Sequence, residues 1–179
     1  APDGSPITAR ETGYVQAISF SRLERIAQRE NGKLKLAVRT GDFVHPKVVI
    51  AYWADMDVVE GCPDADVREC FTLGSMRTPS QDMQFLIDEL VEIGLRALSP
   101  GINDPFTAVT AVHWLGAATA ELARRNLTRS FAEEGEEPHL VPLDDDFEHY
   151  LARGFGAMRS GVATNRIATL VMFDALVDA

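Results

Sequence analysis

RALSPGINDPFTA, residues 96–108, joins two helical patterns of this 179-residue sequence. Ser99-Pro100-Gly101 is suited to ending one helix, because proline disfavours helical geometry in the residue before it and glycine tolerates a positive φ. Asp104-Pro105 is suited to starting the next, since aspartate caps free backbone N–H groups and proline presets φ at the first helical position. The stretch therefore predicts a rigid corner between two helices.

The segments on both sides of this corner have the apolar spacing of packed helices. Thr78-Pro79-Ser80-Gln81 is a helix start signal, and apolar residues recur every three or four positions from there to Leu98. From Pro105 to about Arg125, large apolar residues alternate with alanine and glycine, which permits close helix packing. We therefore expect an antiparallel helix hairpin over residues 79–125.

The first third of the chain has β character. Gly13–Ile18, Lys33–Arg39 and Lys47–Trp53 predict strands, the second by an almost strict apolar alternation. Ser21 and Glu24 have the spacing of a capping box, which predicts a helix start between the first two strands. Glycine-led motifs, Gly13-Tyr14-Val15 and Gly41-Asp42-Phe43-Val44, resemble half of a barrel-sandwich module, although no lysine stands where a lipoyl or biotin acceptor would.

The predicted fold is α+β, with a small β-rich N-terminal unit, half barrel-sandwich-like, followed by a helical unit centred on the antiparallel helix hairpin. Residues 1–12 are expected to form a polar tether, residues 13–55 the β-rich unit with one helix, and residues 64–179 the helical unit. The acidic residues 55–66 are the expected connector. Further helices are expected at 67–74, after Asp144-Asp145-Asp146, and from Ala163 onward, and the acidic segment 126–143 is expected as a loop.

Charge and composition exclude several classes of protein. The net charge of −10 disfavours nucleic acid, whose phosphates the chain would repel. The charge is uneven: residues 1–53 hold eight Lys and Arg against five Asp and Glu, a net of +3, and the remainder is acidic. No apolar run reaches the roughly 18 residues of a membrane span. Cys62 and Cys70 form neither a disulfide framework nor a zinc site by themselves, which favours a reducing compartment.

The corner also concentrates side chains that can bind a ligand. They are Arg96, Ser99, Asn103, Asp104 and Thr107. A guanidinium facing a carboxylate beside a helix N-terminus can hold a small anion or polar ligand. The alternative is that turn and cap chemistry uses all of these groups.

A second polar cluster precedes the predicted hairpin and consists of Arg77, Gln81 and Asp82. Arg77 and Arg96 would lie at opposite ends of a helix of about 20 residues, roughly 30 Å apart at about 1.5 Å per residue. The two clusters are therefore expected to be separate sites.

Other candidate residues have plainer interpretations. Asp145 and His149 are four residues apart and could share a metal, but an aspartate run at a helix start also complements the helix dipole. His113, inside the most apolar helical pattern, is expected as a core histidine. No nucleophile–base pair or catalytic motif can be identified by spacing, so enzyme activity is unsupported, no metal is assigned and any cofactor is unknown.

Several of these stretches occur together in one known family. Gly13–Ile18, Gly41–Val44, Arg77-Thr78 with Gln81-Asp82, and residues 96–108 resemble, in this order, the soluble region of the bacterial predicted membrane protein family called domain of unknown function 2254. The resemblance implies upstream membrane helices outside this chain and supplies no activity.

We therefore expect a non-catalytic soluble domain of a bacterial membrane protein, serving in ligand sensing or subunit assembly, on the cytoplasmic side of the inner membrane. A homo-oligomer is expected because the helices are apolar and rich in alanine. The alternative is an enzyme, or a metal- or anion-dependent site, at the corner 96–108.

Overall fold

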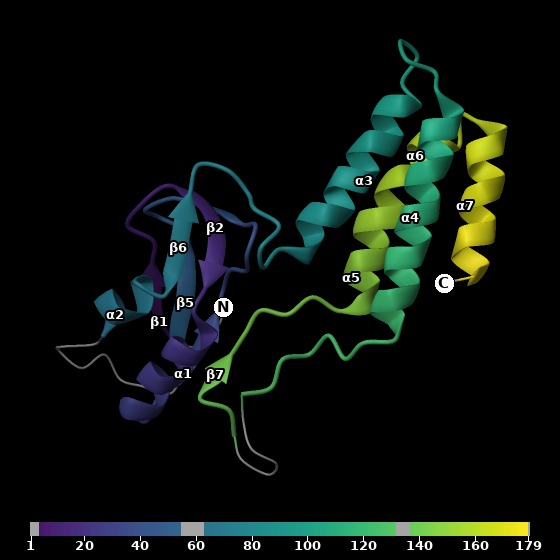
Figure 1. Cartoon of the computed structure of the whole chain (residues 1–179). Coiled ribbons are helices and arrows are strands. Elements are labelled where there is room, and N and C mark those ends of the chain that lie inside the picture. The colour runs from purple at the N-terminus through teal and green to yellow at the C-terminus, as the bar shows by residue number, and fades with distance from the viewer. Residues whose placement is uncertain (1–3, 55–62, 132–136, 179) are drawn as a thin grey trace. The chain divides into compact units, whose positions relative to one another are not determined.

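The computed structural model describes residues 4–54, 63–131 and 137–178, and its elements are labelled in Figure 1. It divides into two compact units. The β unit contains Ala1–Asp82 and Arg129–Asp144, and the helical unit contains Met83–Thr128 and Asp145–Ala179. The chain combines sheets with helices, so the predicted α+β class is confirmed.

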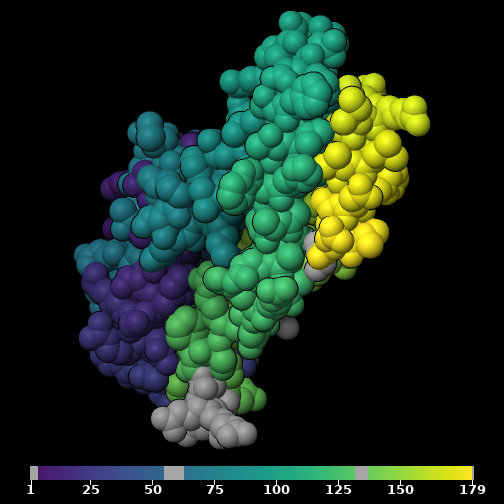
Figure 2. Space-filling view, turned by 45° about the vertical axis from the view of Figure 1, so that its right-hand side comes forward, coloured from purple at the N-terminus to yellow at the C-terminus, as the bar shows by residue number. Residues whose placement is uncertain are grey.

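The helical unit is organised around the two helices that meet at the corner. Helices α3 (Met83–Ala97) and α4 (Pro105–Ala123) pack against each other. Three short helical segments follow in sequence: α5 (Phe147–Leu151), which packs against α4, and the π-helix η1 (Ala152–Gly156) and α6 (Ala157–Val162), which pack against α3. The last helix, α7 (Arg166–Asp178), packs beside α4, as the green and yellow surfaces in Figure 2 show.

Small residues allow these helices to approach closely. A Cβ added at Gly116 of α4 would lie 3.1 Å from the Cβ of Ala175 in α7. Around this contact, Val112, Leu115 and Met158 are at most 1% exposed and form the centre of the core. The alternation of large and small residues in α4 therefore corresponds to packing on more than one side, as its sequence predicts.

The β unit contains two sheets. The first sheet has four strands, which are in spatial order β1 (Ser5–Thr8), β5 (Val49–Ala54), β3 (Lys33–Leu36) and β7 (Leu140–Val141). The second sheet has three strands, which are in spatial order β4 (Phe43–Val44), β2 (Gly13–Ile18) and β6 (Phe71–Gly74). All pairings are antiparallel except that of β3 with β7. Helices α1 (Phe20–Arg29) and α2 (Asp64–Arg68) complete the unit.

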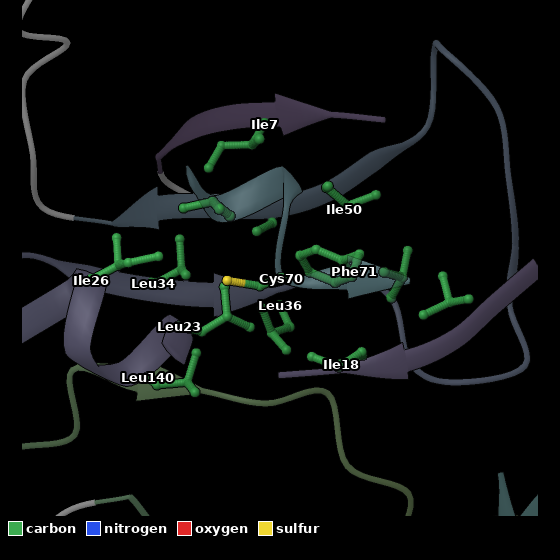
Figure 3. Close-up of a cluster of buried hydrophobic side chains, with 14 of the residues drawn as sticks. Ile7, Ile18, Leu23, Ile26, Leu34, Leu36, Ile50, Cys70, Phe71 and Leu140 are labelled. Carbon is green, nitrogen blue, oxygen red and sulfur yellow. The ribbon is translucent and has the colours of Figure 1, made fainter. Parts of the chain in front are cut away.

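The core of the β unit collects the inward residues of both sheets and of α1 (Figure 3). Leu34 and Leu36 are buried, whereas the lysines that precede each of them, Lys33 and Lys35, are half-buried, so the predicted alternation is present. Trp53 is 1% exposed, and Leu140, contributed from a distant part of the sequence, is fully buried. Leu23, Ile26 and Ala27 form the buried face of α1, as its sequence predicts.

The predicted boundaries differ from the observed ones at several places. The expected tether at residues 1–12 is wrong for Ser5–Thr8, which pair with β5 because Ile7 is a fully buried core residue. The expected helix at 67–74 is wrong beyond Arg68, where α2 ends, because Phe71–Gly74 forms a strand that pairs with β2. The expected loop at 126–143 contains β7. The β unit therefore extends to Asp82 and recruits a later segment.

Two predicted helix starts are also wrong. Helix α3 begins at Met83, not after Thr78, because residues 77–82 pack against the β unit instead. Helix α1 begins at Phe20 after Ser19, and no side chain caps it, so Ser21 does not form the expected capping box. Most of the predicted connector at 55–66, with Cys62, and most of the glutamate run lie outside the described residues. Among the described helices, none is long and apolar enough to cross a membrane.

Candidate functional site

At the corner, Asp104 caps α4. Its Oδ1 accepts hydrogen bonds from the backbone N–H groups of Phe106 and Thr107, both at 3.2 Å, and its Oδ2 accepts one from the Thr107 hydroxyl at 2.6 Å. The Thr107 hydroxyl and N–H together lower the pKa of the Asp104 carboxyl. Pro105 follows at the first helical position. The predicted cap is confirmed, and it uses both carboxylate oxygens.

The turn before Asp104 closes through backbone hydrogen bonds. Asn103 N–H donates to the Ser99 carbonyl at 2.9 Å, and Asp104 N–H donates to the Ala97 carbonyl at 2.8 Å. The Ser99 hydroxyl donates to the Arg96 carbonyl at 2.7 Å. Asn103 adopts the left-handed conformation with φ at 49°, whereas Gly101, the residue expected there, does not. Asparagine tolerates this region better than other residues with a side chain.

Of the five corner candidates, Ser99, Asp104 and Thr107 use their side chains within the turn and the cap, whereas Arg96 pairs outside it and Asn103 contributes through its backbone. The guanidinium of Arg96 pairs with Glu92, one turn earlier on α3, and the Arg96 side chain is 68% exposed. Such exposed pairs contribute little to stability because solvent screens them. The corner side chains thus serve mainly the turn and the cap, as the structural interpretation expects.

Arg96 borders an open groove of about 610 Å³ on the helical unit. The groove lies between α3 and η1 and contains a two-pronged ion pair: Arg153 Nε and Nη2 each lie 2.7 Å from an oxygen of Asp88. Sequence reasoning missed this pair because its members lie 65 residues apart. Arg153 belongs to the π-helix, a local feature frequent at functional sites. Both arginines have carboxylate partners, so the groove does not present an uncompensated cation.

The second predicted cluster lies in the β unit and binds other parts of that unit. Arg77 Nη2 lies 2.7 Å from Asp82 Oδ2, and Asp82 is 2% exposed. Gln81 Oε1 accepts from the Ile18 N–H at 3.0 Å, and its carbonyl accepts from the Thr40 hydroxyl at 2.8 Å. These contacts attach residues 77–82 to β2 and to the turn before β4. The corner and this cluster belong to different units.

The remaining candidates do not assemble into a metal site. His149 Nε2 lies 3.4 Å from Asp145 Oδ1, and Gln84 donates to the other oxygen of that carboxylate. Asp146 caps α5 by accepting from the His149 N–H at 2.8 Å. The described residues contain no group of three or more His, Cys, Asp or Glu able to hold a metal ion. His113 was expected in the core but is exposed, because the buried side of α4 is formed by residues such as Val112 and Leu115.

Comparison with known proteins connects the chain to one family. The family model described as "Predicted membrane protein (DUF2254)" matches residues 1–178. Uncharacterized proteins of Mycobacterium tuberculosis and Mycobacterium bovis are each 33% identical over 163 residues, which cover 88% of this chain. The same residues cover 31% of each relative, so the chain spans about a third of their length. No solved structure matches.

Proposed function

Because the chain belongs to the DUF2254 family of predicted membrane proteins, we propose that it is a non-catalytic soluble region of such a protein and that its helical unit serves in subunit assembly. The relatives are about three times as long, which leaves room for membrane-spanning segments outside this chain. One observation carries the proposal: an apolar face of α7 that no described residue covers.

Exposed apolar side chains concentrate in the helical unit. Eleven of the fourteen large exposed hydrophobic residues among the described residues belong to it. On α7, Ala168 and Met172 are buried, whereas five large apolar residues are exposed, together with Arg166 and Asp174. Four of the five, named the α7 face, are Ile167, Leu170, Phe173 and Val177, and the fifth is Leu176. A surface helix normally directs polar residues outward, so a helix apolar on both sides is expected to be buried in its assembly.

The free energy available from this face is of the same size as the cost of association. Its four side chains are 49%, 54%, 61% and 85% exposed. Burying such a side chain completely contributes about 1.5–3 kcal/mol, so covering the face contributes roughly 4–7 kcal/mol per subunit. A symmetric dimer doubles this to about 8–14 kcal/mol, comparable with the roughly 4–15 kcal/mol that association costs.

Charge disfavours an anionic lipid surface as the partner. The helical unit contains ten Asp and Glu against six Lys and Arg, and its net charge of −4 opposes anionic lipid headgroups. A two-fold arrangement would place the α7 faces of two subunits against each other, since a symmetric dimer uses the same patch on both.

At the corner, three of the five candidate side chains are used by the turn and the cap, which supports the non-catalytic part of the proposal. Asp104 and Thr107 satisfy each other, and Ser99 is bonded to the backbone. An enzyme or anion site at residues 96–108 would need groups that remain available after the turn is built.

We further propose that this region lies on the cytoplasmic side of the inner membrane, which is supported by the buried free thiol of Cys70. A reporter fused to this region, active only in the cytoplasm, tests that placement.

The assembly proposal is tested by Phe173→Glu in the centre of the α7 face. We expect the wild-type chain to sediment as a dimer in analytical ultracentrifugation over a concentration series, and the variant to sediment as a monomer with unchanged circular dichroism. Phe43→Glu is the matched control, because Phe43 is 54% exposed in the β unit and should leave the dimer intact. A monomeric wild type, or a variant that dimerises equally well, would refute the proposal.

A further inference from the structure

The β unit contains a cavity of about 300 Å³ that is unrelated to the α7 face. Its walls come from both sheets and from α2: Ile50 lies on β5, Val44 on β4, and Phe71 on β6. Figure 3 shows Ile50 and Phe71 among the side chains between the strands. The cavity is at the small end of the roughly 300–1,000 Å³ usual for ligand pockets, so it fits a small molecule.

The floor of this cavity is apolar. Val44 is fully buried, Ile50 is 3% exposed, and Ala9 and Phe71 are 5% and 8% exposed. No charged or hydrogen-bonding side chain occurs among these four residues. An apolar group inserted here would replace water against a preformed hydrophobic surface, which favours a ligand with an aliphatic or aromatic body.

The rim of the cavity contains two guanidinium groups. Arg68 is held in position, because its Nε donates to the Thr8 carbonyl at 2.8 Å and its Nη2 lies 3.4 Å from Asp64. These contacts leave Nη1 of Arg68 for a ligand. Arg10 makes no hydrogen bond or ion pair with the described residues. A guanidinium held in place beside one with no hydrogen bond or ion pair to the described residues is suited to a carboxylate, which accepts two parallel N–H bonds.

The carboxylates at the rim are less available to a ligand. Glu69 pairs with Arg22 at 2.7 Å. Of the two glutamates that line the cavity, Glu11 is the one without an ion pair to the described residues. The formal charges that line the cavity balance, with Arg10 and Arg68 against Glu11 and Glu69, so the attraction for an anion comes from the two guanidinium groups themselves.

We infer that this cavity binds a small organic acid with an apolar body. Its carboxylate contacts Arg10 and Arg68 at the rim, and its aliphatic or aromatic body rests on Val44, Ile50 and Phe71. Two sources share this chemistry: a simple carboxylic acid, and an apolar amino acid whose ammonium group would face Glu11. Occupancy would join the two sheets and α2, so binding would stabilise the β unit by mass action.

Titration calorimetry of the whole chain with three probes that share a branched 3-methylbutyl body tests this inference. The probes are 4-methylpentanoate, leucine and 3-methylbutan-1-amine. We expect 4-methylpentanoate to bind and the amine not to bind, because only the acid complements the guanidinium groups. Tighter binding of leucine would identify an amino-acid site, and weaker binding would identify a simple acid site. Binding of neither acid, or binding of the amine alone, would overturn the inference.

Two variants locate the site. Arg10→Gln should weaken acid binding at least about tenfold, as loss of one charge-assisted hydrogen bond predicts, with unchanged circular dichroism. Arg25→Gln is the matched control: it removes the same charge from α1, where Arg25 bonds to its own helix at the Ser21 carbonyl. Ala65→Phe would occupy the mouth of the cavity and should abolish binding. Unchanged affinity in both Arg10→Gln and Ala65→Phe would place any binding elsewhere and overturn the assignment.

Discussion

Gly41→Ala is the single-methyl change that tests how the β unit holds residues 77–82. Gly41 has φ at 92°, where residues with a side chain are strained. A Cβ at this position would overlap the Asp82 carboxylate, reaching Oδ2 and lying 2.9 Å from Cγ, and it would lie 3.1 Å from Arg77 Nε. The methyl group therefore displaces a carboxylate that is 2% exposed and ion-paired.

Two contributions determine the expected loss of stability. Left-handed geometry in a residue with a Cβ costs about 1–2 kcal/mol. Weakening a hydrogen bond to a charged group in a buried position costs about 1.5–3 kcal/mol. The free energy of unfolding of the β unit should therefore fall by about 3–5 kcal/mol.

Urea unfolding followed by tryptophan fluorescence measures this loss. Trp53 is 1% exposed in the β unit, and Trp114 is 65% exposed in the helical unit. A Trp114→Phe background therefore makes the emission specific for the β unit. Gln28→Ala is the control, because Gln28 is exposed on α1 of the same unit and the change should leave the Trp53 transition unaltered. A Gly41→Ala loss below about 0.5 kcal/mol, the usual range of surface substitutions, would refute the packing argument.

Two further predictions concern titratable groups. Asp104→Ala should destabilise α4, whereas Asp104→Asn, which retains a cap acceptor, should retain most of the stability. Hydrogen exchange of the backbone amides in the first turn of α4 distinguishes the two variants. Equal protection of these amides in both variants would contradict the cap. Because the pKa of Asp104 is lowered on folding, its contribution is complete above the unfolded pKa and is lost as the pH falls through the folded pKa, which an NMR titration of its carboxyl measures. Burial raises the pKa of the Cys70 thiol, whose Sγ also contacts the Asp66 carbonyl at 3.3 Å. In a Cys62→Ser background it should therefore react with a disulfide reagent more slowly than free cysteine and reach the free rate in denaturant; an equal rate in the folded state would contradict its burial.

Local signals in the sequence predicted much of the fold correctly. The Asp104-Pro105 start of α4 depends on neighbouring backbone groups, and its cap appears as expected. The alternation of Leu34 and Leu36 likewise identified a strand with one buried side. These features depend on short-range geometry, so a few residues suffice to specify them.

Errors arose where distant segments determine the structure. Thr78 and Pro79 have the chemistry of a helix start, but the buried Arg77–Asp82 pair and the Gln81 contacts hold that segment on the β unit. Phe71 fits a helical face as well as a strand, and pairing with β2 decides between them. At the corner, the sequence identified five polar candidate residues. It could not show which of their side chains bond within the turn and which, like Arg96, extend outside it. The Asp88–Arg153 pair and the cavity in the β unit depend on long-range packing and give no signal in spacing.

The parallel strand β7 has a consequence for how the protein is made. Leu140 is fully buried in the core of the β unit, yet the ribosome synthesises it after all of α3 and α4. The first 82 residues therefore leave the exit tunnel with an incomplete core and an unpaired edge on β3, and they wait for Leu140 and Val141. During this interval the open edge is exposed to other nascent chains. Translation of the intervening residues thus sets the earliest moment at which the β unit can finish folding.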